Sequence, residues 1–450
     1  MNKLIQTFLL GIIIFSCNKV DKANYVIISG KVSNQQINKG ILTNDKDTFA
    51  INIVNNGFCD TLKISEGYYN LGYGEREIPL YLKPGFDLQI QLDKSAKFSG
   101  KGAAENNYLT AQAAQSIELE KYFDEKYYAG LDEKVFLNLM DSIYHIQTNL
   151  FNKNEKEFDS QFNFIEKNKL KYKCLYQKAH YEVAKKILTG KMDFCVSSDY
   201  YPNLFKDIDP NDHRLLDNVD YLNMLDSYIS QTTKSKLKNN DSADLYLTYM
   251  QALNNAISDT LVKEKLSFYL GNTRLERTNK LDEVFQLISK NISNKEYFTT
   301  VESKYKVLKK IEKGAISPTF CFKDVNGKEV ALENLKGRIV YIDIWSTRCE
   351  PCMAEIPYLK KIEEYYKGKN ICFVGINILD TEEDWKNTVK GQSLPGIQLH
   401  APDPKVAFFK DYLVRGIPRY ILIDKDGRIL NRNAVRPLDS KVKDQFEEIL

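Results

Sequence analysis

The chain of 450 residues is 43% hydrophobic, so it can form two or three domains with ordinary hydrophobic cores. It carries 63 Lys and Arg residues and 60 Asp and Glu residues, which gives a formal net charge of +3 at pH 7. A charge this small and this evenly mixed favours no nucleic-acid partner and no strongly acidic one.

The first 17 residues have the pattern of an export signal. Lys3 precedes an apolar run, Phe8 to Phe15, which is too short to cross a bilayer as a mature helix but fits the apolar core of a secretory signal. The run ends at Ser16-Cys17, which resembles a bacterial lipoprotein box, in which the cysteine is lipidated and becomes the new N-terminus. We expect residues 1–17 to be a lipoprotein signal, with Cys17 anchoring the chain to an envelope membrane in an oxidising space.

Residues 24–100 have the pattern of a β-rich domain. Phe86, Leu88, Ile90 and Leu92 alternate with polar residues, as in a strand with one buried face. Lys83-Pro84-Gly85 marks the turn before this strand. These patterns predict a small antiparallel β-sandwich.

Residues 104–311 contain only three Gly and two Pro, which favours helices over a long span. Apolar residues recur at three- and four-residue steps, for example Leu281, Val284 and Ile288. We expect an all-α middle region whose aromatic residues are mainly core. The sequence does not locate a substrate-facing groove there.

Residues 313–450 alternate strand and helix patterns, which predicts an α/β sheet with parallel members. Strands are expected near Phe320, Ile342, Val374 and Ile421, and helices over the ranges 353–367, 381–391, 403–412 and 439–449.

The most informative stretch runs from Ile339 to Pro357. A nearly apolar strand leads through a short turn into Cys349-Glu350-Pro351-Cys352, and a helical pattern follows. Two cysteines three apart in a first helical turn face the same way and can form a disulfide. The free N–H groups and positive dipole end of the helix stabilise a thiolate, the reactive form of cysteine.

The same spacing occurs in zinc sites, but a closed zinc site needs about four ligands. The chain has no second C-x-x-C, and its histidines are isolated from one another (His145, His180, His213 and His400). We therefore expect a redox-active dithiol with no metal and no other cofactor.

Further motifs, in the same order and spacing, make residues 313–450 resemble the thioredoxin superfamily and, within it, the TlpA/ResA-like thiol-disulfide oxidoreductases. They are Gly314-Ala-Ile-Ser-Pro-Thr-Phe320, Asp324-Val-Asn-Gly-Lys-Glu-Val330, Leu332-Glu-Asn-Leu-Lys-Gly337, Gly416-Ile417-Pro418 and Ile421-Leu-Ile-Asp-Lys-Asp-Gly427. The resemblance implies a thioredoxin fold here. The β-rich domain resembles a module of unknown function that often precedes such domains.

The resemblance implies that Cys349 attacks a partner disulfide and that Cys352 resolves the mixed disulfide. Asp343 matches the buried aspartate of thioredoxin; a carboxyl group in an apolar strand should have a raised pKa and can accept the proton of the resolving thiol. The alternative is that Asp343 only caps a turn. Glu355 matches an acidic residue beside the dithiol in this family and either shares the proton-accepting role or is simply a favourable first-turn acid. Which carboxyl group dominates stays open.

On the substrate side, Pro418 matches the family's cis-proline, so that Ile417 would pair with an extended substrate peptide through its main chain. The alternative is a trans proline in an ordinary turn. Trp345 matches the tryptophan that forms a wall of the site.

Two positions depart from the family pattern. Arg348 stands where a tryptophan is usual and Arg419 where a threonine is common. We expect both guanidinium groups beside Cys349, where they would favour its thiolate while nearby glutamates oppose it. Preference for an acidic or unusually shaped partner is the corresponding hypothesis.

The sequence thus predicts an envelope-anchored oxidoreductase that reduces or isomerises disulfides of envelope proteins and receives electrons from a membrane protein. The alternative is a peptide- or glycan-binding lipoprotein that uses the thioredoxin fold as a scaffold. A peroxidase is disfavoured because the residues before Cys349 lack the P-x-x-x-[ST]-x-x-C context. Among the other cysteines, Cys321 and Cys372 are expected to be buried thiols, and a Cys174–Cys195 pair stays open.

Overall fold

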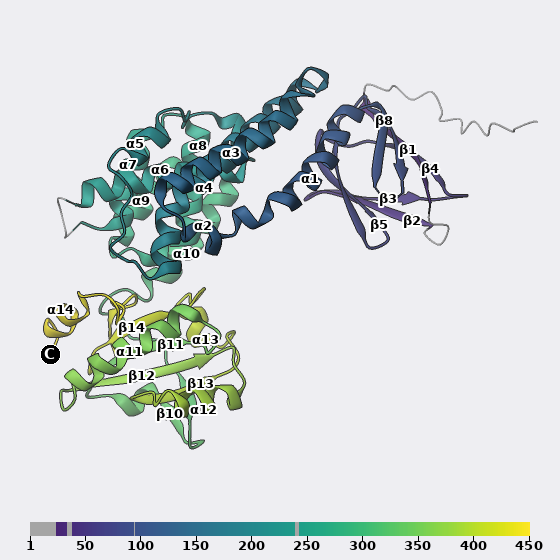
Figure 1. Ribbon diagram of the computed structural model, residues 1–450. Coiled ribbons are helices and arrows are strands. Elements are labelled where there is room, and N and C mark those ends of the chain that lie inside the picture. Colours follow the sequence, from purple (N-terminus) through teal and green to yellow (C-terminus); the bar gives the residue numbers. More distant parts are fainter. Residues whose placement is uncertain (1–23, 34–37, 94, 239–242) are drawn as a thin grey trace, which may run out of the picture. The chain divides into compact units, whose positions relative to one another are not determined.

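The computed structural model describes residues 24–33, 38–93, 95–238 and 243–450 (Figure 1). The expected signal at residues 1–17, with Cys17, lies outside these ranges. The chain divides into two compact units, Met1–Gln231 and Thr232–Leu450. Within the described ranges, no helix combines the length and the apolar character needed to cross a membrane.

The N-terminal β region consists of two four-stranded sheets with strand orders β4-β1-β7-β8 and β3-β2-β5-β6. The strands are β1 Val26–Val32, β2 Lys39–Thr43, β3 Thr48–Asn52, β4 Gly57–Leu62, β5 Gly67–Tyr73, β6 Arg76–Leu82, β7 Asp87–Leu92 and β8 Ala96–Lys101. The alternation at Leu88, Ile90 and Leu92 buries these side chains in the core of this region. The expectation of a purely antiparallel sandwich is wrong in one place, because β1 pairs with β7 in parallel. Strands so distant in sequence are joined by a long crossover, which allows the parallel direction.

Helices occupy the middle of the chain, as the scarcity of Gly and Pro predicts. They are α1 Ala103–Phe123, α2 Glu125–Ala129, α3 Glu133–Asn152, α4 Ser160–Thr189, α5 Tyr200–Phe205, α6 Val219–Leu237, α7 Leu245–Ala256, α8 Thr260–Arg274, α9 Leu281–Asn291 and α10 Lys295–Lys309, with a short 3-10 turn, η4, at Leu275–Arg277. Asp244, Asp259 and Asn294 cap α7, α8 and α10 by accepting hydrogen bonds from first-turn N–H groups. The boundary between the two compact units falls inside this region, so α7 to α10 belong to the same unit as the C-terminal domain.

The C-terminal domain is built on a seven-stranded sheet with strand order β10-β9-β13-β12-β11-β14-β15. Its elements are β9 Cys321–Asp324, β10 Glu329–Ala331, β11 Ile339–Trp345, α11 Glu350–Tyr365, β12 Ile371–Ile378, α12 Glu382–Gly391, β13 Ile397–Ala401, α13 Ala407–Asp411, β14 Arg419–Ile423, β15 Ile429–Asn431 and α14 Val442–Glu447. β11 runs parallel to β12 and antiparallel to β14. Because parallel strands end at the same sheet edge, the segments after Trp345 and Ile378 lie next to each other.

In the described part of the chain, Cys174, Cys195, Cys321 and Cys372 carry free thiols. Cys174 and Cys195 are therefore not paired with each other. Cys372 is buried as expected, but the expectation that Cys321 is buried is wrong. Cys321 stands between Phe320 and Phe322, which both pack against Phe408, so the strand alternation turns the thiol outward.

Candidate active site

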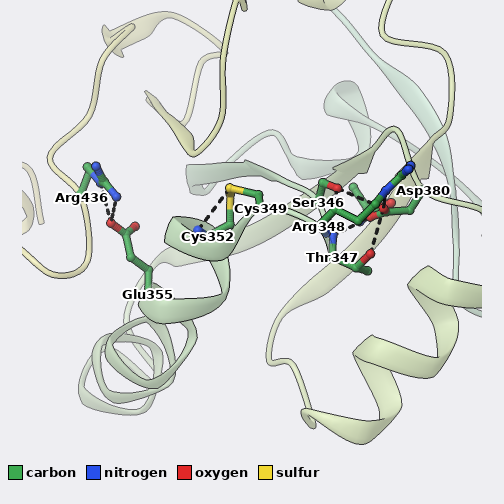
Figure 2. Close-up of a disulfide and its surroundings, with 9 residues drawn as sticks. Ser346, Thr347, Arg348, Cys349, Cys352, Glu355, Asp380 and Arg436 are labelled. Atoms are coloured by element: carbon green, nitrogen blue, oxygen red, sulfur yellow. Dashed lines mark hydrogen bonds and ion pairs between the residues drawn. A yellow bond between two sulfur atoms is a disulfide. The ribbon is translucent and has the colours of Figure 1, made fainter. Parts of the chain in front are cut away.

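The two cysteines of the C-E-P-C motif form a disulfide at the start of α11, with their Cα atoms 5.2 Å apart (Figure 2). Cys349 is the N-cap residue, and its Sγ accepts a hydrogen bond from the Cys352 N–H at 3.2 Å. Cys349 is half-buried, whereas Cys352 is only 4% exposed. Of the two cysteines, Cys349 is therefore the more accessible to a partner molecule.

An apolar cluster surrounds the disulfide. Trp345 at the end of β11 is buried and packs with Cys352 and with Trp385 of α12; Ile417 joins the cluster as a partly buried side chain. The Ile417–Pro418 peptide bond is cis, as expected for that position. Trp385 was not predicted from the sequence, although its place as a lone aromatic residue on a polar helix was a usable signal.

A second group of side chains lies beneath α11. Asp343 is paired directly across β11 and β14 with Tyr420, so both side chains point to the same sheet face. Tyr341 and Trp345, the inward neighbours of Asp343 on β11, both pack in clusters that include residues of α11, so this is the face that α11 covers. Asp343 therefore points toward the helix that carries the dithiol.

Burial raises the pKa of Asp343 to about 8, and the negative charge of Glu355 adds to the rise. A hydrogen bond from Tyr420 and the positive charge of Arg436 act in the opposite direction. The Asp343 Oδ1 atom is buried with no hydrogen-bond partner among the residues that the structure describes. Asp343 can therefore take up and release a proton near neutral pH.

Glu355 has a different environment. It is 1% exposed and forms an ion pair with Arg436, whose Nε and Nη2 groups both contact Glu355 Oε1 (Figure 2). Arg436 follows β15, 81 positions after Glu355 in the chain. No sequence pattern pointed to Arg436 in this role. Because Glu355 has a fixed cationic partner and Asp343 does not, the two carboxyl groups are not equivalent.

The segment just before Cys349 is held by Asp380, which follows β12 and is 4% exposed (Figure 2). Its carboxylate accepts hydrogen bonds from Ser346 Oγ at 3.0 Å, from Thr347 N at 2.6 Å and from Thr347 Oγ1 at 2.9 Å. Asn377 Nδ2 donates a further bond at 2.7 Å. Burial alone would raise the pKa of Asp380, but these donors outweigh it and lower the pKa. The role of Asp380 was not predicted from the sequence; its place just after a buried strand parallel to β11 was the available signal.

Only one of the two unusual arginines lies beside the dithiol. Arg348 is exposed, with its Nε 3.4 Å from Asp380 Oδ1 and its Nη2 donating to the Leu379 carbonyl. The expectation for Arg419 is wrong. Arg419 pairs across the sheet with Ile344, so it points to the face opposite Asp343 and α11. There the charges of Glu276 and Arg432 affect its pKa, which burial lowers to about 10.

Residues 312–448, which contain this site, match the Redoxin family. The thiol-disulfide oxidoreductase ResA of Bacillus cereus is 31% identical over 153 residues, which cover 34% of this chain and 85% of ResA. ResA of Bacillus subtilis is 27% identical over 139 residues, 31% of this chain and 76% of that protein. Among solved structures, the thioredoxin domain of a thiol-disulfide oxidoreductase from Bacteroides vulgatus is 28% identical, covers 30% of this chain and 96% of its own, and has a TM-score of 0.28.

Proposed function

Because the chain belongs to the ResA-type thiol-disulfide oxidoreductases of the thioredoxin superfamily, we propose that its Cys349–Cys352 pair reduces or isomerises disulfides of protein partners at the cell envelope. The observation that carries this proposal is the half-buried Cys349 at the start of α11, joined to a buried Cys352. In such a pair, the accessible sulfur can attack a partner disulfide, and the protected sulfur can then resolve the mixed disulfide.

In the reducing direction, the Cys349 thiolate attacks a partner disulfide, forming a mixed disulfide and releasing one partner thiolate. Cys352 then loses its proton and attacks the Cys349 sulfur, which re-forms the internal disulfide and releases the second partner thiolate. Two electrons pass from the dithiol to the partner. A separate donor must supply two electrons for the next cycle, and we assign this role to a membrane protein.

We assign the proton of Cys352 to Asp343. Its pKa of about 8 is close to that of an ordinary thiol, so the transfer is nearly balanced in energy. Glu355, held by Arg436, then acts on this step through its charge. On the substrate side, partly buried Ile417, which packs in the cluster of buried Trp345, forms the apolar wall against which the partner chain lies. Exposed Arg348 favours partners with an acidic residue near their disulfide.

The decisive test compares Cys349→Ser, Cys352→Ser and, as a matched control, Cys321→Ser, which removes an exposed free thiol of the same domain. We expect Cys349→Ser to abolish reduction of a disulfide peptide, and Cys352→Ser to accumulate a mixed disulfide detectable by mass. Cys321→Ser should retain wild-type turnover. Equal turnover by all three variants would refute the proposal.

The direction of electron flow is tested by equilibrating the protein in glutathione buffers. A potential near that of thioredoxin, about −270 mV, supports the reductant role, whereas one near −120 mV would make the protein an oxidant. Membrane attachment through Cys17 is tested separately in cells. Cys17→Ala should release the protein from the membrane fraction, and unchanged sedimentation with membranes would refute the anchor.

One observation favours the alternative function of ligand capture. Within the first unit, α3 and α4 help to line a cavity of about 500 Å³ whose walls include Tyr144, Cys174 and Tyr200. A cavity of this size can hold a small peptide or a sugar. Binding of peptides or glycans by a Cys349→Ser, Cys352→Ser double variant, without any disulfide turnover by the wild type, would favour this alternative.

A further inference from the structure

The helical segment α8–η4 ends with backbone carbonyls that side chains of the thioredoxin-like domain cover. Arg415 Nη1 donates to the Asn272 carbonyl at 2.9 Å, and Arg432 Nη2 donates to the Thr278 carbonyl at 2.8 Å. Asn433 Nδ2 donates to the Glu276 carbonyl. The last carbonyls of a helix lack partners within the helix and carry its negative dipole end, so arginine is a favourable partner for them.

Several of these contacts involve buried side chains. Arg432 is 8% exposed and Thr278 is fully buried. Lys304 of α10, 5% exposed, also donates to the Asn272 carbonyl at 2.8 Å and pairs with the Glu276 carboxylate. The Asn272 carbonyl and the Glu276 side chain are thus also held by a second helix. All these residues belong to the compact unit Thr232–Leu450.

Arg415 and Arg432 lie on two segments that reach the active site. Arg415 comes two residues before Ile417, which packs in the cluster of both cysteines. Arg432 comes four residues before Arg436, the partner of Glu355. Each segment therefore contacts the helices at one end and the active site at the other.

We propose that the helical segment 260–309 is a positioning element of the disulfide site. Arg415 sets the place of Ile417 and thereby the fit of the partner chain. Arg432 sets the place of Arg436 and thereby the charge around Glu355 and Asp343. This inference rests on the proposed function. It adds a role for part of the helical region, which the proposed function by itself does not require.

The two arginines act on different steps, so their variants should differ. Arg415→Gln removes the contact next to the substrate wall, and we expect the KM for a disulfide peptide to rise about three- to tenfold with little change in kcat. Arg432→Gln removes the hydrogen bond that holds the segment of Arg436, so Arg436 is held less firmly beside Glu355. The groups that face Asp343 are Tyr341, Tyr420, Glu355 and Arg436, and Arg436 is the cation among them. The midpoint of the pH profile of kcat should therefore move upward.

The experiment uses the full chain and compares these variants with Arg428→Gln. Arg428 is also exposed and also donates to a backbone carbonyl, that of Gly314 at 3.0 Å, which lies outside the helical segment 260–309. Arg415 is exposed, so Arg415→Gln should fold. If Arg432→Gln does not fold, Arg432→Lys provides the second variant. We expect a smaller shift for it, because Arg432 donates to the Thr278 carbonyl through Nη2 and to the Glu276 carbonyl through Nε, and lysine cannot donate to two carbonyls in the same fork. The inference would be overturned if the variants fold and do not differ from Arg428→Gln. That is, Arg415→Gln would show the KM of Arg428→Gln, and the Arg432 variant would show its pH profile. Absence of turnover in the wild type would instead overturn the proposed function.

Discussion

Replacing Asp343 by Asn tests whether a buried, titrating carboxyl group lies under the dithiol helix. The substitution keeps the size of the side chain and its ability to accept a hydrogen bond from Tyr420, but it removes the ionisation. Since the folded-state pKa is raised from 3.8 to about 8, the unfolded chain releases the proton of Asp343 first as the pH rises. The stability contributed by the neutral carboxyl group is fully present below about pH 4 and is lost progressively up to about pH 8.

Each pKa unit corresponds to about 1.4 kcal/mol, so the loss between pH 5 and pH 8 would reach about 4 kcal/mol for a fully shielded group. Asp343 keeps a small accessible surface, and solvent screening reduces the effect. We therefore expect the free energy of unfolding of the wild type to fall by about 2 to 4 kcal/mol more than that of Asp343→Asn over this range.

The assay is urea unfolding of the oxidised protein at pH 5 and pH 8, followed by tryptophan fluorescence. The chain has two tryptophans, and both Trp345 and Trp385 lie in the buried cluster beside the disulfide. The signal therefore reports this domain and not the rest of the chain. Asp411→Asn, an exposed carboxylate of the same domain, is the control. Parallel pH dependence of the wild type and Asp343→Asn would refute a raised pKa at Asp343.

Four further substitutions test the site. Glu355→Gln removes a charge that raises the pKa of Asp343, so the pH midpoint of kcat should move downward, whereas Arg436→Gln should move it upward; pH-dependent turnover separates the two. Asp380→Ala leaves the donors of the loop before Cys349 without an acceptor and should cost about 3 to 5 kcal/mol in urea unfolding, and a cost below 1 kcal/mol would contradict the holding role of Asp380. Trp385→Ala removes a fully buried side chain and should cost about 3 to 5 kcal/mol; a loss of thermal stability with the disulfide potential unchanged would confirm that Trp385 supports packing alone.

The local features of the site could be predicted because they depend on short-range patterns. Two cysteines three apart after an apolar strand place a dithiol at a helix N-terminus whatever the rest of the fold does. Asp343 stood out because a single charge interrupted an apolar strand, and Pro418 because it stood in a motif with a known family resemblance. The helical middle region followed in the same way from the scarcity of Gly and Pro.

The long-range features depended on the tertiary structure. Glu355 and Arg436 are 81 positions apart, and the pairing of their charges is decided by the path of the chain after β15. The error at Arg419 has the same origin: proximity to Pro418 in sequence suggested proximity to Cys349, but alternation along β14 turned the side chain to the other sheet face. Strand and helix periodicity determine which way a side chain points relative to its own element, whereas its partners depend on which elements pack together. The dithiol was therefore determined by the sequence alone, and the charges that tune it by the tertiary fold.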